Sequence, residues 1–385
     1  MAQKNTYRIV TLPGDGIGPE VMAEGKKVLA TVARLGRVSF EIEEIECGGH
    51  YYQLHGREWP EGSEARCDTA DAMLLGAVGH QIDGKDVFTR PGEPYPTPQL
   101  AGYAQVIGNR RRLALYANVR PVKLYKGVKQ KICNKFVEVW DPAAVDYVIV
   151  RENTEGEYTG ETRTLEDEKG VAYGAETPIR ITRAATERVC RYAFRLARKR
   201  AKLKKVTCVE KSNIVGAHKY FRTICTEVGR EFPDITLDFA YFDAFCQWQL
   251  RNPEWFDIVV APNLVGDTVS DNGSTTAGGM GFAAGGNIGD EHAMFEPIHG
   301  SAPKYTGQDK VNPCATILAV RMMLEWLGDR YGDERLRKGA GIVERAVADV
   351  MAAGKVATYD QGGSSKCSQM GTAVAERVKE LFQGA

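Results

Sequence analysis

The chain has 385 residues, 43% of them hydrophobic and 26% charged, and its 50 basic and 50 acidic residues give a formal net charge of zero. The length suits two ordinary domains or one large domain with an insertion, and the composition is typical of a globular protein. The zero net charge gives no support to binding of nucleic acids or membrane surfaces. Because the chain has neither a signal-like start nor an apolar run of about 18 residues, we expect a cytoplasmic protein.

The N-terminal region predicts a strand followed by a helix. "YRIVTLPGDG" has the apolar pattern of a strand that breaks at Pro13, and residues 18–36 follow with a helical stripe of valine and leucine. "LPGDGIGPE" joins them and has two interpretations: a phosphate-binding loop, with Glu41 or Glu43 as the ribose acid, or a tight structural turn. Its spacing is GxGxG instead of GxGxxG, which favours the turn.

The middle of the chain alternates between strands and helices. "AMLLGAVG" is a buried strand, and "RRRLALYANVRPV" passes from helix to strand. Four further strands, "DYVIVREN", "KVTCVEKSN", "ITLDFAYFD" and "FDIVVAPN", alternate with helices at 184–203 and 216–231, and residues 310–384 are mostly helical. This alternation predicts an α/β fold. The polar segment 155–180 is either a β-arm that exchanges with a partner subunit or a mobile surface hairpin.

Charged residues follow the predicted strands. Ligands of α/β sheets bind beyond the carboxyl ends of the strands, and we place five charged residues at those ends: Arg120, Arg151, Lys211, Asp243 and Asp267. Together with Arg110, the two arginines suit a substrate with two or more carboxylates, although any one of them alone is more often a surface ion-pair partner.

Asp267 and Asp271 are four residues apart on one predicted helical face, where like charges repel. A divalent cation between them removes the repulsion, and with Asp243 they form a set of hard oxygen ligands suited to Mg²⁺ or Mn²⁺. Asp271 as an ordinary exposed residue is the alternative. Tyr158 and Lys211 are candidate acid/base groups, or else a half-buried strand residue and an exposed lysine.

The long loop 296–313 contains His299, Gly300 and Asn312, and its backbone amides and short side chains suit an adenosine. Lys304 and Tyr305 suit an additional phosphate. An ordinary surface loop is the alternative. The nine cysteines are scattered without a CxxC pair, which predicts reduced, buried thiols and no zinc site.

Four motifs, "YANVRPV", "VRENTEGEY", "NLVGDTVSD" and "HGSAPKYTGQDKVNP", closely resemble those of the metal-dependent β-decarboxylating dehydrogenases, the isocitrate/isopropylmalate dehydrogenase family. The resemblance covers nearly the whole chain. It implies the two-domain α/β fold of that family, which is not a Rossmann fold, with a β clasp arm. It further implies a large domain of residues 1–115 plus 278–385 with the cofactor cleft, a small domain of residues 116–277, and a homodimer with shared active sites.

The same resemblance implies residue roles. Arg110, Arg120 and Arg151 correspond to the clamp for substrate carboxylates, Tyr158 to the acid that protonates the product carbon, and Lys211 to the group that helps to remove the hydroxyl proton. Asp267 and Asp271 correspond to metal ligands, joined by the partner subunit's Asp243. Further implied substrate contacts are Val106, Ile107 and Asn213. The implied cofactor contacts are Ile17, Thr97, His299, Gly300, Ser301, Ala302, Lys304, Tyr305, Asn312 and Tyr359.

The resemblance also bears on the cofactor. NAD-specific relatives have Asp after "GSAP", whereas this chain has Lys304 and Tyr305, as NADP-dependent isocitrate dehydrogenases do. Val311 and Tyr359 match that class as well, but Gly363 replaces its arginine. We therefore expect a higher kcat/KM with NADP than with NAD.

The motifs disagree about the substrate. Ala104 and Val106, with Ile107 beside them, replace the Ser and Asn of isocitrate enzymes, and this apolar lining favours 3-isopropylmalate. "RENTEG", "KVNP" and "KCSQMG" favour isocitrate. On the motifs we expect conversion of isocitrate to 2-oxoglutarate and CO₂, with isopropylmalate, homoisocitrate and tartrate or D-malate as alternatives. A regulatory subunit without catalysis, or a metal-free nucleotide-binding protein, is the alternative of another class.

Overall fold

A computed structural model describes residues 4–79, 81–82, 85–86 and 102–384. The chain forms two compact units, which are treated separately below. Unit 1 comprises Met1–Leu115, Lys123–Pro142 and Ser274–Ala385, and unit 2 comprises Tyr116–Val122 and Ala143–Gly273. The segment 123–142, which we assigned to the small domain, lies in unit 1, because it packs on that unit's loops: the Lys129 amide donates to Gln361 Oε1 at 2.9 Å.

Unit 1 contains five neighbouring strands in the order β15-β16-β3-β1-β2. β1 is parallel to β2 and β3, β16 is parallel to β3, and β15 is antiparallel to β16. Their bounds are β1 Thr6–Gly14, β2 Ser39–Glu44, β3 Ala72–Ala77, β15 Ala284–Ile288 and β16 Ala293–Pro297. Two short hairpins belong to this unit: β4 Gln81–Ile82 with β5 Lys85–Asp86, and β7 Gln130–Ile132 with β8 Lys135–Val137.

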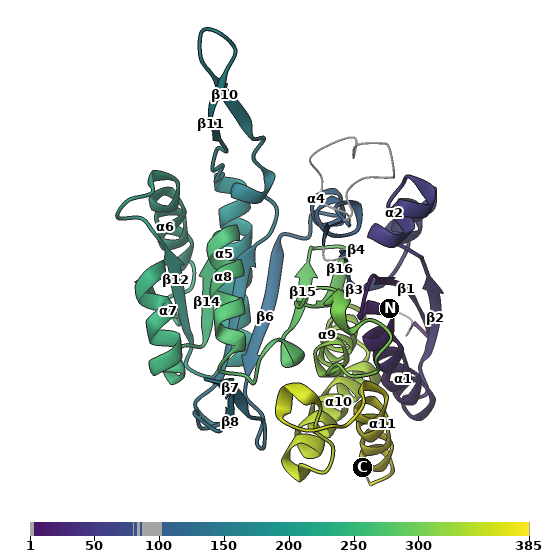
Figure 1. Ribbon diagram of the computed structural model, residues 1–385. Coiled ribbons are helices and arrows are strands. Elements are labelled where there is room, and N and C mark those ends of the chain that lie inside the picture. Colours follow the sequence, from purple (N-terminus) through teal and green to yellow (C-terminus); the bar gives the residue numbers. More distant parts are fainter. Residues whose placement is uncertain (1–3, 80, 83–84, 87–101, 385) are drawn as a thin grey trace. The chain divides into compact units, whose positions relative to one another are not determined.

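The helices of unit 1 form layers on these strands (Figure 1). α9 packs against β15, β16 and β3, and α10 and α11 form an outer layer in which α11 lies against α1. α9 is apolar around most of its circumference, as expected for an interior helix. The bounds are α1 Gly18–Gly36, α2 Gly49–His55, α3 Ser63–Asp68, η1 Ala104–Gly108, α4 Asn109–Arg112, η4 Met280–Phe282, η5 Pro303–Tyr305, α9 Cys314–Tyr331, α10 Glu334–Ala353, η6 Tyr359–Gln361 and α11 Cys367–Gln383.

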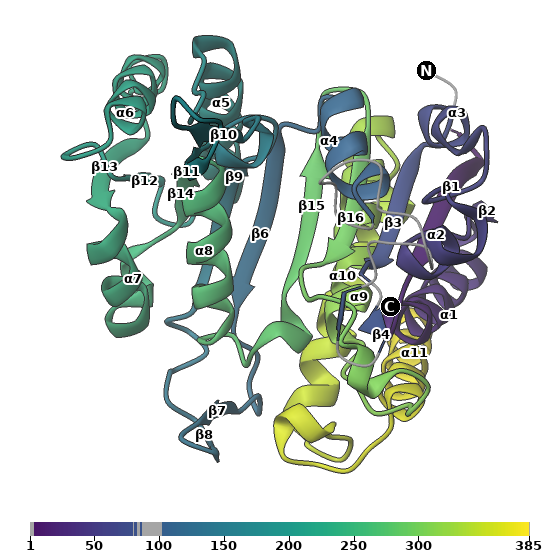
Figure 2. The same cartoon turned by 45° about the horizontal axis from the view of Figure 1, so that its top comes forward.

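Unit 2 has the strand order β13-β12-β14-β9-β6, and the pairs β13–β12, β12–β14 and β14–β9 are parallel. The chain moves from β9 to β12 to β13 in one direction and then turns back to β14. Right-handed crossovers therefore place α5 and α6 on one face and α7 on the other, and α8 lies on the same side as α7 (Figure 2). The bounds are β6 Ala117–Lys123, β9 Asp146–Glu152, η2 Glu157–Thr159, α5 Arg183–Arg200, β12 Lys205–Glu210, α6 Gly216–Gly229, β13 Thr236–Tyr241, α7 Phe242–Arg251, η3 Pro253–Trp255, β14 Ile258–Ala261 and α8 Asn263–Ser274.

The polar segment 155–180 contains an antiparallel hairpin of β10 (Arg163–Glu166) and β11 (Ala172–Glu176). It projects from the rest of unit 2 (Figure 1). Val171 and Tyr173 on this hairpin expose 59% and 71% of their surface. A strand arm is thus confirmed, and its role in a subunit interface stays a prediction.

The predicted strands and helices are found close to their expected positions, with three corrections. β1 continues through Pro13 to Gly14. Arg120 lies in the interior of β6 and not at its end. Asp243 and Asp267 lie on the helices that follow β13 and β14, because both strands end two residues earlier than the sequence pattern indicates.

All nine cysteines are free thiols, as predicted, and seven of them are buried. Burial raises the pKa of the Cys67 thiol to about 11, so that it stays protonated at neutral pH. Among the described residues, no helix is long and apolar enough to cross a membrane.

Asp333 connects the N-terminus of α10 to β1 through hydrogen bonds. Its carboxylate accepts hydrogen bonds from the Arg335 amide and guanidinium and from the Tyr7 hydroxyl. The Arg335 hydrogen bond is the main cause that lowers the pKa of Asp333 from 3.8 to about 2.

Asp333→Asn is expected to lower the free energy of unfolding by roughly 2 kcal/mol at neutral pH. Because folding lowers this pKa, the contribution is complete above the unfolded value near pH 4 and is lost as the pH falls toward 2. Chemical unfolding at pH 7 and pH 3 checks this, with Glu61→Gln as the exposed control. If wild type and Asp333→Asn differed by the same free energy of unfolding at both pH values, this assignment would be contradicted.

Candidate active site

The glycine-rich turn after β1 is a structural turn. Gly14 and Gly16 have φ values of 74° and 60°, and a Cβ on Gly16 would overlap the carbonyl oxygen of Ser301. The Asp15 carboxylate points into the fold and accepts hydrogen bonds from the amides of Gly49, His50 and Gly79 at 2.8–2.9 Å. Backbone packing therefore explains the glycines without a phosphate.

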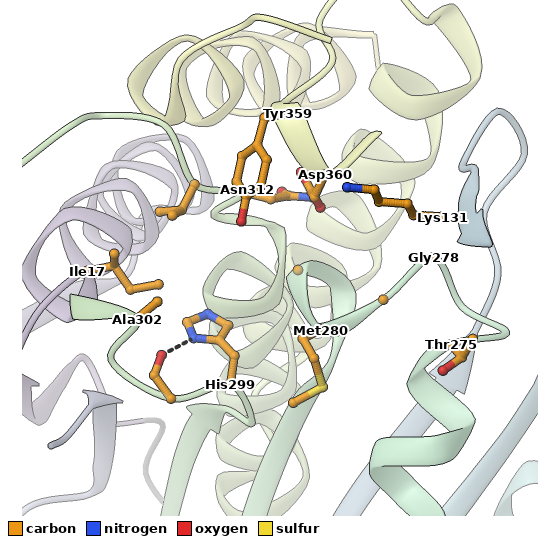
Figure 3. A pocket seen from close by; sticks show the side chains of 14 residues that line it. Ile17, Lys131, Thr275, Gly278, Met280, His299, Ala302, Asn312, Tyr359 and Asp360 are labelled. Atoms are coloured by element: carbon orange, nitrogen blue, oxygen red, sulfur yellow. Dashed lines mark hydrogen bonds between the residues drawn. The ribbon is translucent and has the colours of Figure 1, made fainter. Parts of the chain in front are cut away.

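This turn places Ile17 at the edge of a pocket in unit 1. The Ile17 amide donates to Ser301 O at 2.9 Å, which joins the turn to the loop after β16. The pocket has a volume of about 630 Å³, within the range of small-molecule sites. Its walls come from the loops before α9 and after α10, the segment after α8, and the β7–β8 hairpin (Figure 3).

Six of the ten predicted cofactor contacts line this pocket: Ile17, His299, Gly300, Ala302, Asn312 and Tyr359. Ser301 is not among the lining residues, because its hydroxyl is turned away to donate to Gly79 O. Lys304 and Tyr305 lie next to the pocket and not in its wall, and Thr97 falls outside the described residues. Sequence reasoning missed seven lining residues, which come from segments far apart in the chain: Lys131, Thr275, Gly278, Gly279, Met280, Gly281 and Asp360.

The polar groups of the pocket are arranged for hydrogen bonding. His299 Nδ1 lies 3.0 Å from Gly300 O, whereas its Nε2 is buried without a hydrogen-bond partner among the described residues. Burial lowers the pKa of His299, so the ring is neutral and Nε2 is an acceptor. Asn312 Nδ2 donates to Asp360 Oδ2 at 3.1 Å. A flat ring with a polar edge, such as a nucleobase, suits a mainly apolar pocket that offers His299 Nε2 as an acceptor.

Arg110 is held in unit 1. Its Nε donates to Asn287 Oδ1 and its Nη2 forms an ion pair with Glu296 Oε1, both at 2.9 Å, and all three side chains are buried. Sequence reasoning did not assign roles to Asn287 and Glu296, because Arg110 is more than 170 positions away in the chain and meets them only after folding. The arrangement fixes the guanidinium in one orientation.

The two remaining arginines meet one carboxylate in unit 2. Asp267 Oδ1 accepts hydrogen bonds from Arg120 Nη1 at 2.9 Å and from Arg151 Nη1. Both guanidiniums are almost fully buried, with 6% and 2% of their side-chain surface exposed. A guanidinium is suited to bind a carboxylate, because it can form two parallel hydrogen bonds with it.

Neutral side chains accept further hydrogen bonds from these two arginines. Asn118 Oδ1 accepts from Arg120 Nε, and Ser270 Oγ accepts from Arg120 Nη1, at 2.9 and 2.7 Å. Asn263 Oδ1 accepts from Arg151 Nε at 2.9 Å and its amide donates to Glu155 O at 2.6 Å. These neutral oxygens fix the orientation of both guanidiniums beside Asp267.

Tyr158 completes this cluster from the loop after β9. Its hydroxyl donates to Asp267 Oδ2 at 2.6 Å, and its ring lies over the Arg151 guanidinium at 5.1 Å. Burial, together with Asp267, raises the pKa of Tyr158 to about 12. Tyr158 is therefore a protonated phenol at neutral pH and suited to give a proton.

Asp271 lies one helical turn after Asp267 on α8. Its Oδ1 is 3.4 Å from Arg120 Nη1, and its side chain is 53% exposed. Partial burial raises its pKa, as does the nearby negative charge of Asp267. Two carboxylates on one helix face are suitable oxygen donors for Mg²⁺ or Mn²⁺, which also take waters and substrate oxygens. The described residues of one chain contain no group of three or more His, Cys, Asp or Glu suited to a metal.

Lys211 and Asp243 form an exposed pair elsewhere in unit 2, with Lys211 Nζ 2.6 Å from Asp243 Oδ1. The Lys211 hydrogen bond lowers the pKa of Asp243. Lys211 follows β12 directly, and Asp243 is in the first turn of α7. Asn213 is exposed in the turn after Lys211.

The residues before Arg110 form a π-helical turn, η1, a conformation that is frequent at functional sites. Ala104 and Val106 are partly buried and pack against an apolar core cluster of unit 1. Ile107 is also only partly buried. This turn therefore presents aliphatic side chains, with no hydroxyl or amide at these three positions.

The chain is similar to known proteins over nearly its full length. A family model described as isocitrate/isopropylmalate dehydrogenase matches residues 8–374. The chain is 38% identical over 381 residues to the 3-isopropylmalate dehydrogenase of Thermobifida fusca, covering 97% of this chain and 98% of that protein. It is 37% identical over 378 residues to the 3-isopropylmalate/3-methylmalate dehydrogenase of Methanocaldococcus jannaschii, covering 97% and 99%.

A solved structure is similar over the same length. The isocitrate dehydrogenase of Methylococcus capsulatus matches with a TM-score of 0.82 and 32% sequence identity, covering 97% of this chain and 99% of that one.

Proposed function

Since the chain belongs to the isocitrate/isopropylmalate dehydrogenase family, it is a decarboxylating dehydrogenase, and we propose that its substrate is a 3-alkylmalate of the isopropylmalate type. This choice reverses our expectation of isocitrate, because the relatives reported above at 37–38% identity are named for isopropylmalate. The aliphatic side chains of η1 support it, since an alkyl group binds there without leaving a polar group unpaired.

The observation that carries the proposed chemistry is the cluster around Asp267. Arg120 and Arg151 bind the substrate carboxylates through their guanidiniums, which Asn118, Ser270 and Asn263 hold in place. Tyr158 gives its proton to the carbon from which CO₂ has left. Asp267 orients all three groups, because its two carboxylate oxygens accept hydrogen bonds from each of them.

The donor set around α8 fits a divalent cation. Asp267 and Asp271 would hold it, and the partner subunit's Asp243 would join them in a homodimer. When bound, the cation stabilises negative charge on substrate oxygens as a Lewis acid, and the nicotinamide accepts the C2 hydride. The exposed β10–β11 arm, with Val171 and Tyr173, supplies apolar surface for such a dimer.

Lys211 is suited to take the substrate's hydroxyl proton. In one chain its amine is bound to Asp243 near the protein surface. We infer that the pair acts at the active site of the second subunit, so that each site needs both chains.

For the cofactor we propose NADP as the better substrate and NAD as the weaker one. The pocket of unit 1 provides an apolar floor and acceptors for the adenine, and Lys304 and Tyr305 lie beside it. The expected result is a higher kcat/KM with NADP than with NAD, and a tenfold preference for NAD would overturn it.

Isocitrate is the second candidate, because the chain is also similar to a solved isocitrate dehydrogenase. A substrate panel with Mn²⁺ and each cofactor distinguishes the two. We expect kcat/KM for 3-isopropylmalate to exceed that for isocitrate by at least about tenfold. Val106→Ser is expected to narrow this ratio, and Leu264→Ser, at an exposed position, is the matched control. A kcat/KM that is lower for 3-isopropylmalate than for isocitrate would make isocitrate the better-supported substrate.

A further inference from the structure

His218 contacts the backbone of the turn that contains Lys211 in unit 2. It is a buried residue in the first turn of α6, and its Nδ1 accepts a hydrogen bond from the Lys211 amide at 3.1 Å. The Lys211 carbonyl accepts from the amide of Val215 at 2.8 Å. The start of α6 therefore fixes the peptide groups on both sides of the Lys211 Cα.

The hydrogen bond to Lys211 determines the state of the His218 ring. An imidazole nitrogen that accepts from an amide has no proton, so the proton of the neutral ring is on Nε2. Burial lowers the pKa of His218, which keeps the ring neutral at pH 7. Nε2–H is thus a donor, and it is buried without a hydrogen-bond partner among the described residues. Because an unused buried donor is destabilising, an acceptor is expected beside it.

Glu157 offers this acceptor. Its Oε1 lies 3.9 Å from His218 Nε2, and its Oε2 is also buried without a hydrogen-bond partner in the described part of the chain. A movement of about 1 Å makes this contact a hydrogen bond. The other acid that acts on the ring, Glu210, is already occupied, because it accepts from Arg222 Nε at 2.7 Å and from the Ser212 amide. Glu157 is therefore the carboxylate available to His218.

These contacts join two segments that contain proposed catalytic groups. Glu157 immediately precedes Tyr158 in η2, and Lys211 directly follows β12. A carboxylate that binds one nitrogen of an imidazole fixes the direction of the other nitrogen. The pair of Glu157 and His218 can therefore hold the Lys211 turn in one orientation, although the sequence motifs assign a role to neither residue.

We propose that His218 is a positioning residue for Lys211, and that Glu157 holds its imidazole in place. The proposal rests on the proposed function, because it takes Lys211 as the group that removes the hydroxyl proton at the active site of the second subunit. The loop that supplies Tyr158 to one site then also holds the Lys211 turn for the other.

Two substitutions separate the two ends of the imidazole. His218→Gln places an amide near Nε2 and removes the acceptor at Nδ1, whereas His218→Asn places an amide oxygen near Nδ1. We expect His218→Gln to lower kcat by about tenfold or more, with KM and Mn²⁺ affinity within about twofold of wild type. His218→Asn is expected to recover most of this loss. His55→Gln, the same change at an exposed histidine of α2, is the matched control.

The kinetic result can contradict the proposal in two ways. A kcat of His218→Gln within about twofold of wild type would show that the Nδ1 hydrogen bond does not position Lys211. An equal loss in His218→Asn and His218→Gln would show that the acceptor at Nδ1 is not the feature that matters. Circular dichroism should show that both variants are folded.

Mixed dimers show at which site the defect acts. The Asp267→Asn chain has an intact Lys211 turn, so mixing it with His218→Gln should restore one fully active site in each mixed dimer. Mixing His218→Gln with Lys211→Met should restore none. Glu157→Ala is expected to give the same pattern with a smaller loss of kcat, about threefold to tenfold. If Asp267→Asn does not rescue these variants, the defect lies at their own chain's site, and the proposal is wrong.

The ring can also be observed without turnover. NMR of wild-type protein labelled with ¹⁵N at histidine, assigned by the signals lost in His218→Asn, should show a neutral His218 at pH 7 with its proton on Nε2. A proton on Nδ1 would exclude the hydrogen bond to Lys211. A wild-type protein without dehydrogenase activity refutes the proposed function, whereas an active protein that is insensitive to His218→Gln refutes only this inference.

Discussion

Asp267→Asn is expected to reduce kcat by roughly a thousandfold or more with the fold retained. The change removes the charge to which Arg120, Arg151 and Tyr158 are bound, and it replaces one of the two carboxylates on α8 that we propose as metal ligands with a neutral amide. Steady-state turnover with Mn²⁺ measures the first effect. Electron paramagnetic resonance of Mn²⁺ in the presence of substrate measures the second, and we expect weaker binding.

Two controls separate this effect from loss of structure. Asp234→Asn removes an exposed carboxylate paired with Arg198 in the same unit and should leave kcat within about twofold. Circular dichroism should show a folded Asp267→Asn protein. Mixing it with the Lys211→Met variant should restore activity if the two chains share each site. A kcat of the Asp267→Asn variant within threefold of the wild-type value would contradict the proposed catalytic role of Asp267.

Tyr158→Phe is expected to lower kcat by roughly a hundredfold to a thousandfold while KM and Mn²⁺ affinity change little. The substitution keeps the ring that lies over Arg151 and removes only the proton donor. Because the pKa of Tyr158 is about 12, the wild-type rate should show no alkaline decline from this group below about pH 11.

Tyr220→Phe is the matched control, since Tyr220 is an equally exposed tyrosine on α6, and it should leave kcat unchanged. An unchanged kcat for Tyr158→Phe would show that another group supplies the proton. A raised KM with normal kcat would instead make Tyr158 a binding residue.

The sequence was sufficient to predict the elements that local patterns determine. The apolar stripe of α1, the buried strand β3 and the Asp267–Asp271 spacing on α8 each depend on residues a few positions apart. The predicted ends of strands were less accurate, because hydrogen bonding to neighbouring strands decides where a strand ends. Arg120, for example, was predicted at the end of a strand but lies in the interior of β6.

Contacts between distant segments could not be predicted from one sequence. Asn287 and Glu296 hold Arg110 across more than 170 positions. Lys131 lines the pocket of unit 1 from a hairpin that the sequence analysis placed in the other domain. The support of Arg151 by Asn263 is of the same kind. Motif spacing contains no signal for such pairs, whereas the residues within the motifs themselves gave a useful set of candidates.

The substrate preference shows a second limit. Motifs shared among family members favoured isocitrate, whereas the three aliphatic residues of η1 indicated an alkyl group. The residues that contact the variable part of a substrate are informative about specificity, because the shared motifs bind the part that all family substrates have in common.

The most direct test of the central claim is a product balance with metal-stripped enzyme. Protein treated with a chelator is assayed with 3-isopropylmalate and NADP before and after Mn²⁺ is restored, and reduced cofactor and CO₂ are both quantified. The account predicts negligible turnover without metal and, with Mn²⁺, equal amounts of NADPH and CO₂. Full activity in the stripped enzyme, or reduced cofactor formed without CO₂, would contradict it.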